Sequence, residues 1–335
     1  MRLLVTGAAG FIGSNFVRHW LANNPMDFIV ALDLLTYAGN RANLDDIAAS
    51  QMRFVKGDIA DREQMRRLLA DEHVDCIVNF AAESHNSLAI VNPGQFFRTN
   101  VLGTQVLLDA ARETGTTRFH HISTCEVYGD LALDADEQFF EDSPYRPRTP
   151  YNASKAGADH AVRAYFETFG LPVTISNCCN NYGPFQFPEK LIPLFTSLAL
   201  DDKRLPVYRS ADNKREWIHV MDHCRAIESI IKHGRIGETY NVGTGREASI
   251  TEIADTILDI LGKDRGLKMS VPDRPGHDRR YLLNSDKIRR ELDWSPGIDF
   301  DQGIHDTVAW YRDNRAWWEP LRDRSPVVES GWKPA

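Results

Sequence analysis

A tyrosine and a lysine stand four residues apart, as Tyr151 and Lys155, in "TPYNASKAGADHAV". On the helix that this stretch predicts, both side chains lie on one face. A phenol with a pKa of about 10 is a weak base at neutral pH, but a neighbouring ammonium group favours its ionised form. Tyr151 could then accept the proton of a hydroxyl group while a hydride leaves the carbon that bears this hydroxyl. Because YxxxK is common by chance, this hypothesis requires that another part of the sequence has a motif that binds a hydride-accepting cofactor.

A dinucleotide site is predicted near the N-terminus, where "VTGAAGFIGSN" has three glycines in a GxxGxxG pattern between a strand and a helix. Such glycines let the backbone approach a pyrophosphate at a helix N-terminus. The next strand ends at Asp33, about 20 residues on, where a carboxylate binds a ribose diol and repels a 2′-phosphate. This favours NAD over NADP. The expected cofactor-binding residues are Gly7, Gly10, Phe11, Ile12, Gly13, Asp33, Asp58, Ile59, Ala81, Tyr151 and Lys155.

A thiol and a carboxylate are adjacent at Cys125 and Glu126 in "HISTCEVYGDL", directly after a predicted strand. Taken alone, Glu126 would be a solvated loop carboxylate, and Cys125 could be a small buried filler or part of the chemistry. In a straight strand Cys125 would face away from Thr124 and Glu126. Shared chemistry therefore requires the chain to bend at this point.

Short apolar runs alternate with helical patterns up to about residue 175, which predicts an α/β fold. The expected architecture is a Rossmann-type doubly wound parallel sheet, with the ligand at the carboxyl ends of its strands. The predicted strands are 2–6, 28–33, 53–58, 75–82, 118–124 and 172–177, and the predicted helices include 14–24, 61–72 and 100–115.

The alternation weakens after residue 180, where segments 180–188, 209–217 and 271–281 are expected to be loops between shorter elements. We expect an NAD-binding Rossmann domain over residues 1–180. Residues 181–335 should form mainly a smaller substrate-binding lobe, with some elements returning to the Rossmann domain.

Composition excludes several other classes of protein. A net charge of −8 over 335 residues argues against a nucleic-acid surface. The five cysteines are scattered without CxxC spacing, so neither a disulfide framework nor a metal site is expected. The sequence has no apolar run of about 18 residues and no room for a signal peptide before its first glycine, which predicts a cytoplasmic protein without a membrane span.

The chain resembles the extended short-chain dehydrogenase/reductase superfamily, which has GxxGxxG, "NFAAESH" (79–85), "TNVLGT" (99–104), "ISTCEVYG" (122–129) and YxxxK in this order. Within it, the chain is similar to nucleoside-diphosphate-hexose 4,6-dehydratases of the dTDP-glucose type. The stretches that carry this similarity are "LTYAGNRANL" (35–44), "YNASKAGADH" (151–160), "NNYGPFQFPEKLIPL" (180–194), "DRPGHDRRY" (273–281) and "GIHDTVAWYRDNRAWW" (303–318).

The resemblance implies a hydro-lyase with tightly bound NAD. Tyr151 acts as the base while the sugar C4 is oxidised, water leaves from C5 and C6, and hydride returns to C6. The product is a 4-keto-6-deoxyhexose nucleotide. Thr124 would bind near the C4 oxygen and Glu126 would remove the C5 proton. The expected catalytic residues are Thr124, Cys125, Glu126, Tyr151 and Lys155.

Cys125 departs from the family pattern, which has an acidic Asp immediately before the Glu. Several alternatives follow. Cys125 or a water supplies the proton for the leaving hydroxyl; or hydride returns to C4 and a 5,6-ene (exo-glycal) sugar is released by a 5,6-dehydratase; or the protein is a nucleoside-diphosphate-glucuronate decarboxylase, which fits the rest of the chain less well. Cys125 could also be filler, and a silent NAD-binding protein is the alternative that is not an enzyme.

The resemblance places the nucleotide-sugar contacts at Ser84, His85, Asn181, Glu189, Lys190, Leu191, Arg215, Asn241, Arg274 and His277. Two stretches differ from the family. "SHNSLAI" (84–90) replaces SHVDRSI, and "YRSADNKRE" (208–216) replaces a Gly-Asp-Gly turn. The hexose therefore need not be plain glucose, and the base of this dTDP- or UDP-hexose could be uracil or thymine. The resemblance also implies a homodimer through the 99–108 and YxxxK helices.

Overall fold

The computed structural model describes residues 1–324; the end of the second predicted domain, 325–335, lies outside the described residues. Its centre is a seven-stranded parallel sheet in the order β10-β6-β5-β4-β1-β2-β3. The order changes direction between β1 and β4, where a crevice forms at the carboxyl ends of the strands. The predicted Rossmann-type sheet is confirmed. Its strands are β1 (Arg2–Thr6), β2 (Phe28–Asp33), β3 (Met52–Lys56), β4 (Cys76–Asn79), β5 (Arg118–Thr124), β6 (Val173–Cys178) and β10 (Thr239–Val242).

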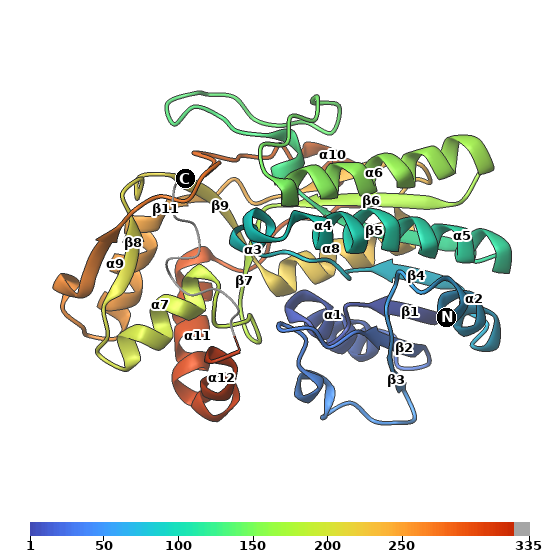
Figure 1. Cartoon of the computed structure of the whole chain (residues 1–335), viewed down its shortest axis with the longest axis horizontal. Coiled ribbons are helices and arrows are strands. Elements are labelled where there is room, and N and C mark those ends of the chain that lie inside the picture. The colour runs from blue at the N-terminus through green and yellow to red at the C-terminus, as the bar shows by residue number, and fades with distance from the viewer. Residues whose placement is uncertain (325–335) are drawn as a thin grey trace.

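Helices cover both faces of this sheet (Figure 1). Successive side chains of β1 serve opposite faces: Leu3 and Val5 belong to one apolar cluster and Leu4 to the other. The first cluster includes side chains of α1 (Phe11–Asn23) and α8 (Val220–His233). The second includes side chains of α2 (Arg62–Asp71), α5 (Thr104–Thr114) and α6 (Pro150–Phe169).

Between β4 and α5 the chain forms short helices that contact α6. They are α3 (Asn86–Val91), α4 (Pro93–Phe96) and a π-helical segment, η2 (Phe97–Gly103). The segment 100–115, predicted as one helix, is thus divided between η2 and α5. Among the helices of residues 1–324, none has the length and hydropathy that a bilayer crossing requires.

A smaller lobe lies beyond the carboxyl edge of the sheet (Figure 1). It has a three-stranded sheet in the order β11-β9-β7 and a parallel pair, β12 and β8. Its elements are β7 (Asn180–Tyr182), α7 (Leu191–Leu200), β8 (Leu205–Tyr208), β9 (Lys214–His219), β11 (Glu247–Ser249), α9 (Ile250–Ile260), β12 (Lys268–Val271), α11 (Phe300–Asp313) and α12 (Arg315–Arg322). Between β12 and α11, α10 (Asp286–Leu292) contacts β10 of the large sheet.

The prediction that 180–188 and 209–217 are loops was wrong at β7 and at the start of β9. Both strands are short, and their hydrogen-bonding partners come from distant parts of the sequence: β9 pairs with β7 on one side and with β11 on the other. Local periodicity cannot reveal such a strand, because the pairing partner supplies its stability. The sequence also missed β10, which pairs with β6 at the edge of the large sheet.

Candidate active site

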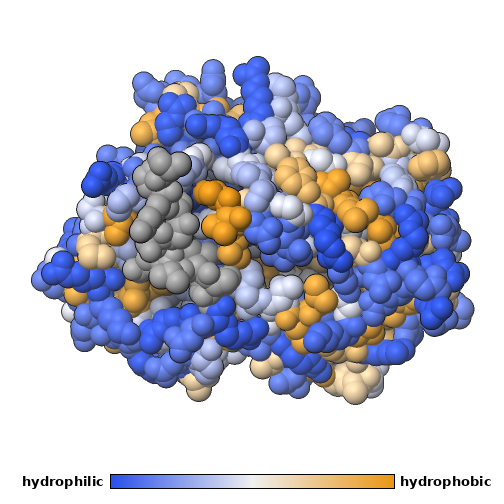
Figure 2. Space-filling view, viewed as in Figure 1, coloured by the Kyte–Doolittle hydropathy of each residue, from blue (hydrophilic) through white to orange (hydrophobic). Residues whose placement is uncertain are grey.

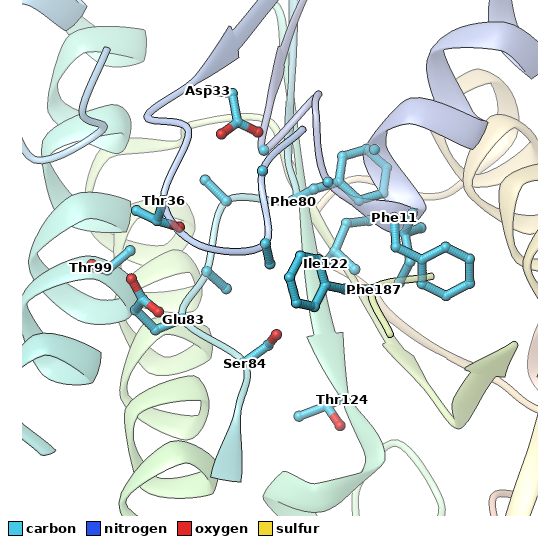
Figure 3. Close-up of a pocket in the computed structure, with 18 of the residues that line it drawn as sticks. Phe11, Asp33, Thr36, Phe80, Glu83, Ser84, Thr99, Ile122, Thr124 and Phe187 are labelled. Atoms are coloured by element: carbon cyan, nitrogen blue, oxygen red, sulfur yellow. The ribbon is translucent and has the colours of Figure 1, made fainter. Parts of the chain in front are cut away.

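A cavity opens at the carboxyl ends of β1, β2, β4 and β5, and every predicted cofactor-binding residue lines it. Asp33 and Thr124 lie toward opposite ends of this cavity, with Phe80 and Ile122 between them (Figure 3). Phe187, from the lobe side, and Phe11, from the start of α1, add apolar surface to the same space. The cavity is therefore elongated, with a carboxylate near one end and the YxxxK helix near the other.

The glycines of the first turn allow a close packing that any side chain would prevent. Gly7 has a φ of +64°, and a Cβ atom there would lie 2.8 Å from the backbone nitrogen of Ala81. A Cβ atom on Gly13 would lie 2.2 Å from the carbonyl oxygen of Gly7. The turn can thus lie directly against the end of β4 and leave the N-terminus of α1 facing the cavity, as a pyrophosphate requires.

Asp33 is fixed by the backbone at the end of β2. Its Oδ2 accepts a hydrogen bond from the nitrogen of Ala9 (2.9 Å), and its Oδ1 accepts one from the nitrogen of Leu35 (2.8 Å). Burial raises the pKa of Asp33, whereas these two hydrogen bonds lower it. Each carboxylate oxygen retains a lone pair for a further donor. The residues at this end of the cavity therefore fit the diol of a dinucleotide ribose.

Tyr151 and Lys155 project from the first turns of α6 and both are buried. Nζ of Lys155 donates a hydrogen bond to the carbonyl oxygen of Ile122 (2.7 Å) and lies 3.3 Å from Nε2 of His121. Burial, followed by the charge of Glu126, raises the pKa of Tyr151 well above its usual value, while a hydrogen bond with Thr124 lowers it. This net direction is opposite to the one that the sequence favours, because desolvation outweighs any help from the ammonium group.

Asp159, which the sequence analysis missed, lies one helical turn beyond Lys155. Its Oδ2 accepts hydrogen bonds from the hydroxyls of Ser123 (2.7 Å) and Tyr145 (2.9 Å), whereas its Oδ1 has no hydrogen-bond partner among the described residues. The charge of Asp159 raises the pKa of Lys155, which burial lowers. The signal was present in the sequence, since a carboxylate four residues after a lysine shares its helix face.

The chain does bend after β5, where Cys125–Tyr128 form a 3₁₀ turn, η3. Oγ1 of Thr124 caps this turn by accepting a hydrogen bond from the nitrogen of Glu126 (3.3 Å). Thr124 and Glu126 line the cavity, but Cys125 does not. Cys125 is 1% exposed and packs in an apolar cluster with Val127 and Tyr128. Burial, and then Glu126, raise the pKa of the thiol well above its usual value, so it is neutral at neutral pH.

Glu126 occupies a site of mixed charge. Burial raises its pKa, and Asp278 raises it further. Arg274 and Arg215 lower the pKa, and so does a hydrogen bond from Asn86. Two arginines that the resemblance assigns to the substrate thus act electrostatically on this carboxylate, although neither lines the cavity.

Four predicted substrate-binding residues line the cavity: Ser84, Asn181, Glu189 and Lys190. Nζ of Lys190 donates a hydrogen bond to the carbonyl oxygen of Ser84 (3.1 Å) and lies 3.6 Å from Oε1 of Glu189. The hydroxyl of Tyr37 donates a hydrogen bond to Glu189 (2.8 Å). These contacts join the segment after β4 to the segment before α7 across the cavity mouth.

The other six predicted substrate-binding residues do not line the cavity; they are His85, Leu191, Arg215, Asn241, Arg274 and His277. Asn241 is farthest from the expected role. It is fully buried, its Oδ1 accepts a hydrogen bond from Tyr128 (2.9 Å), and its Nδ2 donates one to the carbonyl of Phe139 (2.9 Å). Both ends of its amide are thus used within the core.

Arg215 and His277 lie together in the smaller lobe. Arg215 donates hydrogen bonds to the backbone carbonyls of 214, 278 and 279, and its guanidinium lies over the ring of Tyr281. His277 packs against Tyr208, and its Nδ1 lies 3.2 Å from Oγ of Ser210. Burial lowers the pKa of His277 to about 2, and the charges of Arg274 and Arg215 contribute in the same direction.

A parallel sheet with a glycine-rich first turn, a carboxylate at the end of its second strand and a buried Tyr–Lys pair is the arrangement of the extended short-chain dehydrogenase/reductases. The chain belongs to the GDP-mannose 4,6 dehydratase family, which it matches over residues 4–307.

Known proteins make the relationship more specific. The chain is 49% identical to a dTDP-glucose 4,6-dehydratase of Streptomyces niveus, covering 99% of this chain and 98% of that protein. It is 46% identical to dTDP-glucose 4,6-dehydratase 1 of Escherichia coli, with coverage of 95% and 94%. The dTDP-glucose 4,6-dehydratase of Streptomyces venezuelae, solved with NAD and TYD bound, has a TM-score of 0.93 and 51% identity, covering 96% of this chain and 100% of that one.

Proposed function

We propose that this protein is an NAD-dependent dTDP-glucose 4,6-dehydratase. The observation that carries the proposal is that Thr124, Glu126, Tyr151 and Lys155 line one cavity together with every predicted dinucleotide contact. The Tyr151–Lys155 pair beside a dinucleotide suits oxidation of an alcohol, and the separate carboxylate suits removal of the proton that this oxidation acidifies. The similarity over nearly the whole chain to dTDP-glucose dehydratases supports both the substrate and the cofactor.

In the proposed mechanism Tyr151 takes the proton of the C4 hydroxyl, and Thr124 orients the C4 oxygen through its hydroxyl. NAD⁺, held by the glycine turn and Asp33, would accept the C4 hydride and return it to C6, and its positive charge would favour the phenolate. Lys155 supplies a second positive charge on the helix face of Tyr151. The C4 ketone then acidifies the hydrogen on C5.

Glu126 takes the C5 proton, and the C6 hydroxyl leaves with a proton as water. Because Cys125 is buried away from the cavity, we propose that protonated Glu126 itself supplies that proton. After hydride reaches C6, C5 takes up one proton, which balances the one that Tyr151 removed. The net change is loss of one water and no net oxidation, giving a 4-keto-6-deoxy sugar nucleotide.

The test is turnover by the purified protein. We expect dTDP-glucose to give a 4-keto product with a C6 methyl group by NMR, and the product formed in D₂O to carry one deuterium at C5. A 5,6-unsaturated product would replace this proposal with the 5,6-dehydratase, and loss of carbon dioxide from a glucuronate nucleotide would replace it with the decarboxylase. If the protein binds NAD but converts no dTDP- or UDP-sugar, the alternative of a silent NAD-binding protein would replace the proposal.

We propose that the protein works as a homodimer. Large apolar side chains are exposed on η2 and at the end of α6, namely Phe97, Leu102 and Phe169. Figure 2 shows hydrophobic residues over the α4, α5 and α6 side of the molecule. A face of this kind is typical of a protein interface. Light scattering should give a dimer mass, and Leu102→Lys should shift it toward the monomer; a monomeric wild type would refute the dimer.

We also propose a cytoplasmic location. The five cysteines of the chain are unpaired and buried, which suits a reducing compartment. Fractionation of the source cells tests this: the proposal requires the protein in the cytoplasmic fraction, and recovery elsewhere would contradict it.

A further inference from the structure

The carboxylate of Glu126 has one side-chain hydrogen-bond donor among the described residues. Nδ2 of Asn86, the first residue of α3, donates to Oε2 of Glu126 at 3.1 Å. Asn86 is itself oriented, because its Oδ1 accepts a hydrogen bond from the hydroxyl of Thr149 at 3.0 Å. An amide whose oxygen is held by a donor must turn its NH₂ group the other way, which here is toward Glu126.

Thr149 connects Asn86 and Glu126 to the helix that carries Tyr151 and Lys155. It is the N-cap of α6, and its Oγ1 accepts a hydrogen bond from the backbone nitrogen of Asn152 at 3.2 Å. The hydroxyl therefore caps the helix that carries Tyr151 and donates its proton to Asn86. One chain of hydrogen bonds, from the start of α6 through Thr149 and Asn86, ends on the carboxylate of Glu126.

Two departures from the family pattern meet at this carboxylate. At position 125, an acidic residue is replaced by a thiol that faces the core. At position 86, the valine of SHVDRSI is replaced by asparagine, whose amide contacts Glu126. The chain thus lacks the acidic residue next to Glu126 in the sequence and has an oriented amide donor on its carboxylate.

We propose that Asn86, held by Thr149, is a positioning residue that aims Glu126 at the sugar C5 and favours its ionised, basic form. This deepens the proposed dehydratase function and rests on it. A hydrogen bond donated to a carboxylate stabilises the charged form, and Glu126 must be charged to remove a proton. Without that donor, the carboxylate would rotate and bind a proton more readily.

The other charged and titratable groups around Glu126 define the background against which Asn86 acts. Asp278 raises the pKa of Glu126, and Arg274 and Arg215 lower it. Glu126 in turn interacts electrostatically with Tyr151, Cys125, Cys178 and Tyr281. A substitution at position 86 changes none of these groups. A shift in the acidic limb of the pH profile of kcat/KM therefore reports the loss of the hydrogen bond from Asn86 to Glu126.

The experiment compares Asn86→Leu and Asn86→Asp with the wild type, each with bound NAD. Asparagine and aspartate are nearly equal in shape, so the second variant removes the donor while keeping the packing. For both we expect substrate oxidation to persist and reduced nicotinamide to accumulate in a single turnover, because C5 deprotonation slows about tenfold. The acidic limb of kcat/KM should rise by about one pH unit, and more for Asn86→Asp, whose carboxylate repels that of Glu126.

A substrate deuterated at C5 gives the sharper readout, since its isotope effect should grow in both variants as this step becomes limiting. Asn92→Leu, at the exposed C-terminal end of the same helix α3, is the matched control. If both Asn86 variants match that control in pH profile and isotope effect, the proposal is wrong. If Asn86→Leu does not fold, Asn86→Asp and Thr149→Val, which removes the donor to Asn86, decide it. A wild type that does not oxidise dTDP-glucose would refute the dehydratase instead.

Discussion

Oδ1 of Asp159 lies 3.5 Å from Nε2 of His121, the same imidazole nitrogen that lies 3.3 Å from Nζ of Lys155. All three side chains are buried. Burial lowers the pKa of His121 well below its usual value, so this imidazole is neutral between a cation and an anion. Burial lowers the pKa of Lys155, and the charge of Asp159 opposes that shift, so Asp159 favours the protonated ammonium.

Replacing Asp159 with Asn should reduce turnover while the protein stays folded with NAD bound. The change removes a charge and keeps the shape, so the pKa of Lys155 should fall and the basic limb of the pH–rate profile should move to lower pH. We expect a rate loss of about tenfold or more. Asp313→Asn, an exposed position on α11, serves as the control. A profile equal to that control would show that Asp159 has no influence on Lys155.

Tyr151→Phe should abolish turnover, with a loss of at least about 10²-fold, because the C4 hydroxyl loses its proton acceptor. The apolar contact with Phe96 is retained, since only the hydroxyl is removed. Mixing the variant with dTDP-glucose should produce no reduced nicotinamide, although NAD remains bound. Normal production of reduced nicotinamide would remove Tyr151 from the mechanism.

Cys125→Ala should leave the rate of C6 loss within about threefold of the wild type, because the thiol packs in the core and does not line the cavity. The cost should be in stability, about 1–2 kcal/mol for the buried volume removed. Quench-flow product analysis and thermal unfolding measure the two effects. Normal oxidation combined with a tenfold slower C6 loss, or faster loss in Cys125→Asp, would instead identify Cys125 as the acid.

We expect the stability of the fold to depend on pH through Glu216. It is fully buried in β9, accepts hydrogen bonds from the nitrogens of Gly245 (2.7 Å) and Leu283 (2.9 Å), and has a pKa raised by burial to about 7. Because the folded state holds this proton more tightly than the unfolded state, its contribution to stability is present at acidic pH and falls as pH rises to about 7.

The expected loss from Glu216 is about 3 kcal/mol across that window. Measured by urea unfolding, the stability of Glu216→Gln relative to wild type should therefore improve as pH rises from about 4.5 to 7. A difference between the two proteins that does not change with pH would contradict the raised pKa.

The sequence predicted the parts of the fold that local chemistry controls. The glycine turn, Asp33 and Tyr151 lie where their spacing indicated, because strand ends and helix faces follow from periodicity. Strand β9 could not be predicted, since its stability depends on partners distant in the chain. Asn241 matched the family by position only, and packing placed its amide in the core.

For this protein, the sequence by itself determined the class of sheet, the glycine turn with Asp33 and the Tyr–Lys pair, since each depends on residues within one or two neighbouring elements. The tertiary structure decided which side chains meet Glu126. The 3₁₀ turn after β5 sends Cys125 into the core and Glu126 toward the cavity. Asn86 reaches that carboxylate from α3, and Thr149, at the start of α6, holds Asn86. Side-chain direction at a bend and contacts between distant segments depend on three-dimensional packing, which no local pattern specifies.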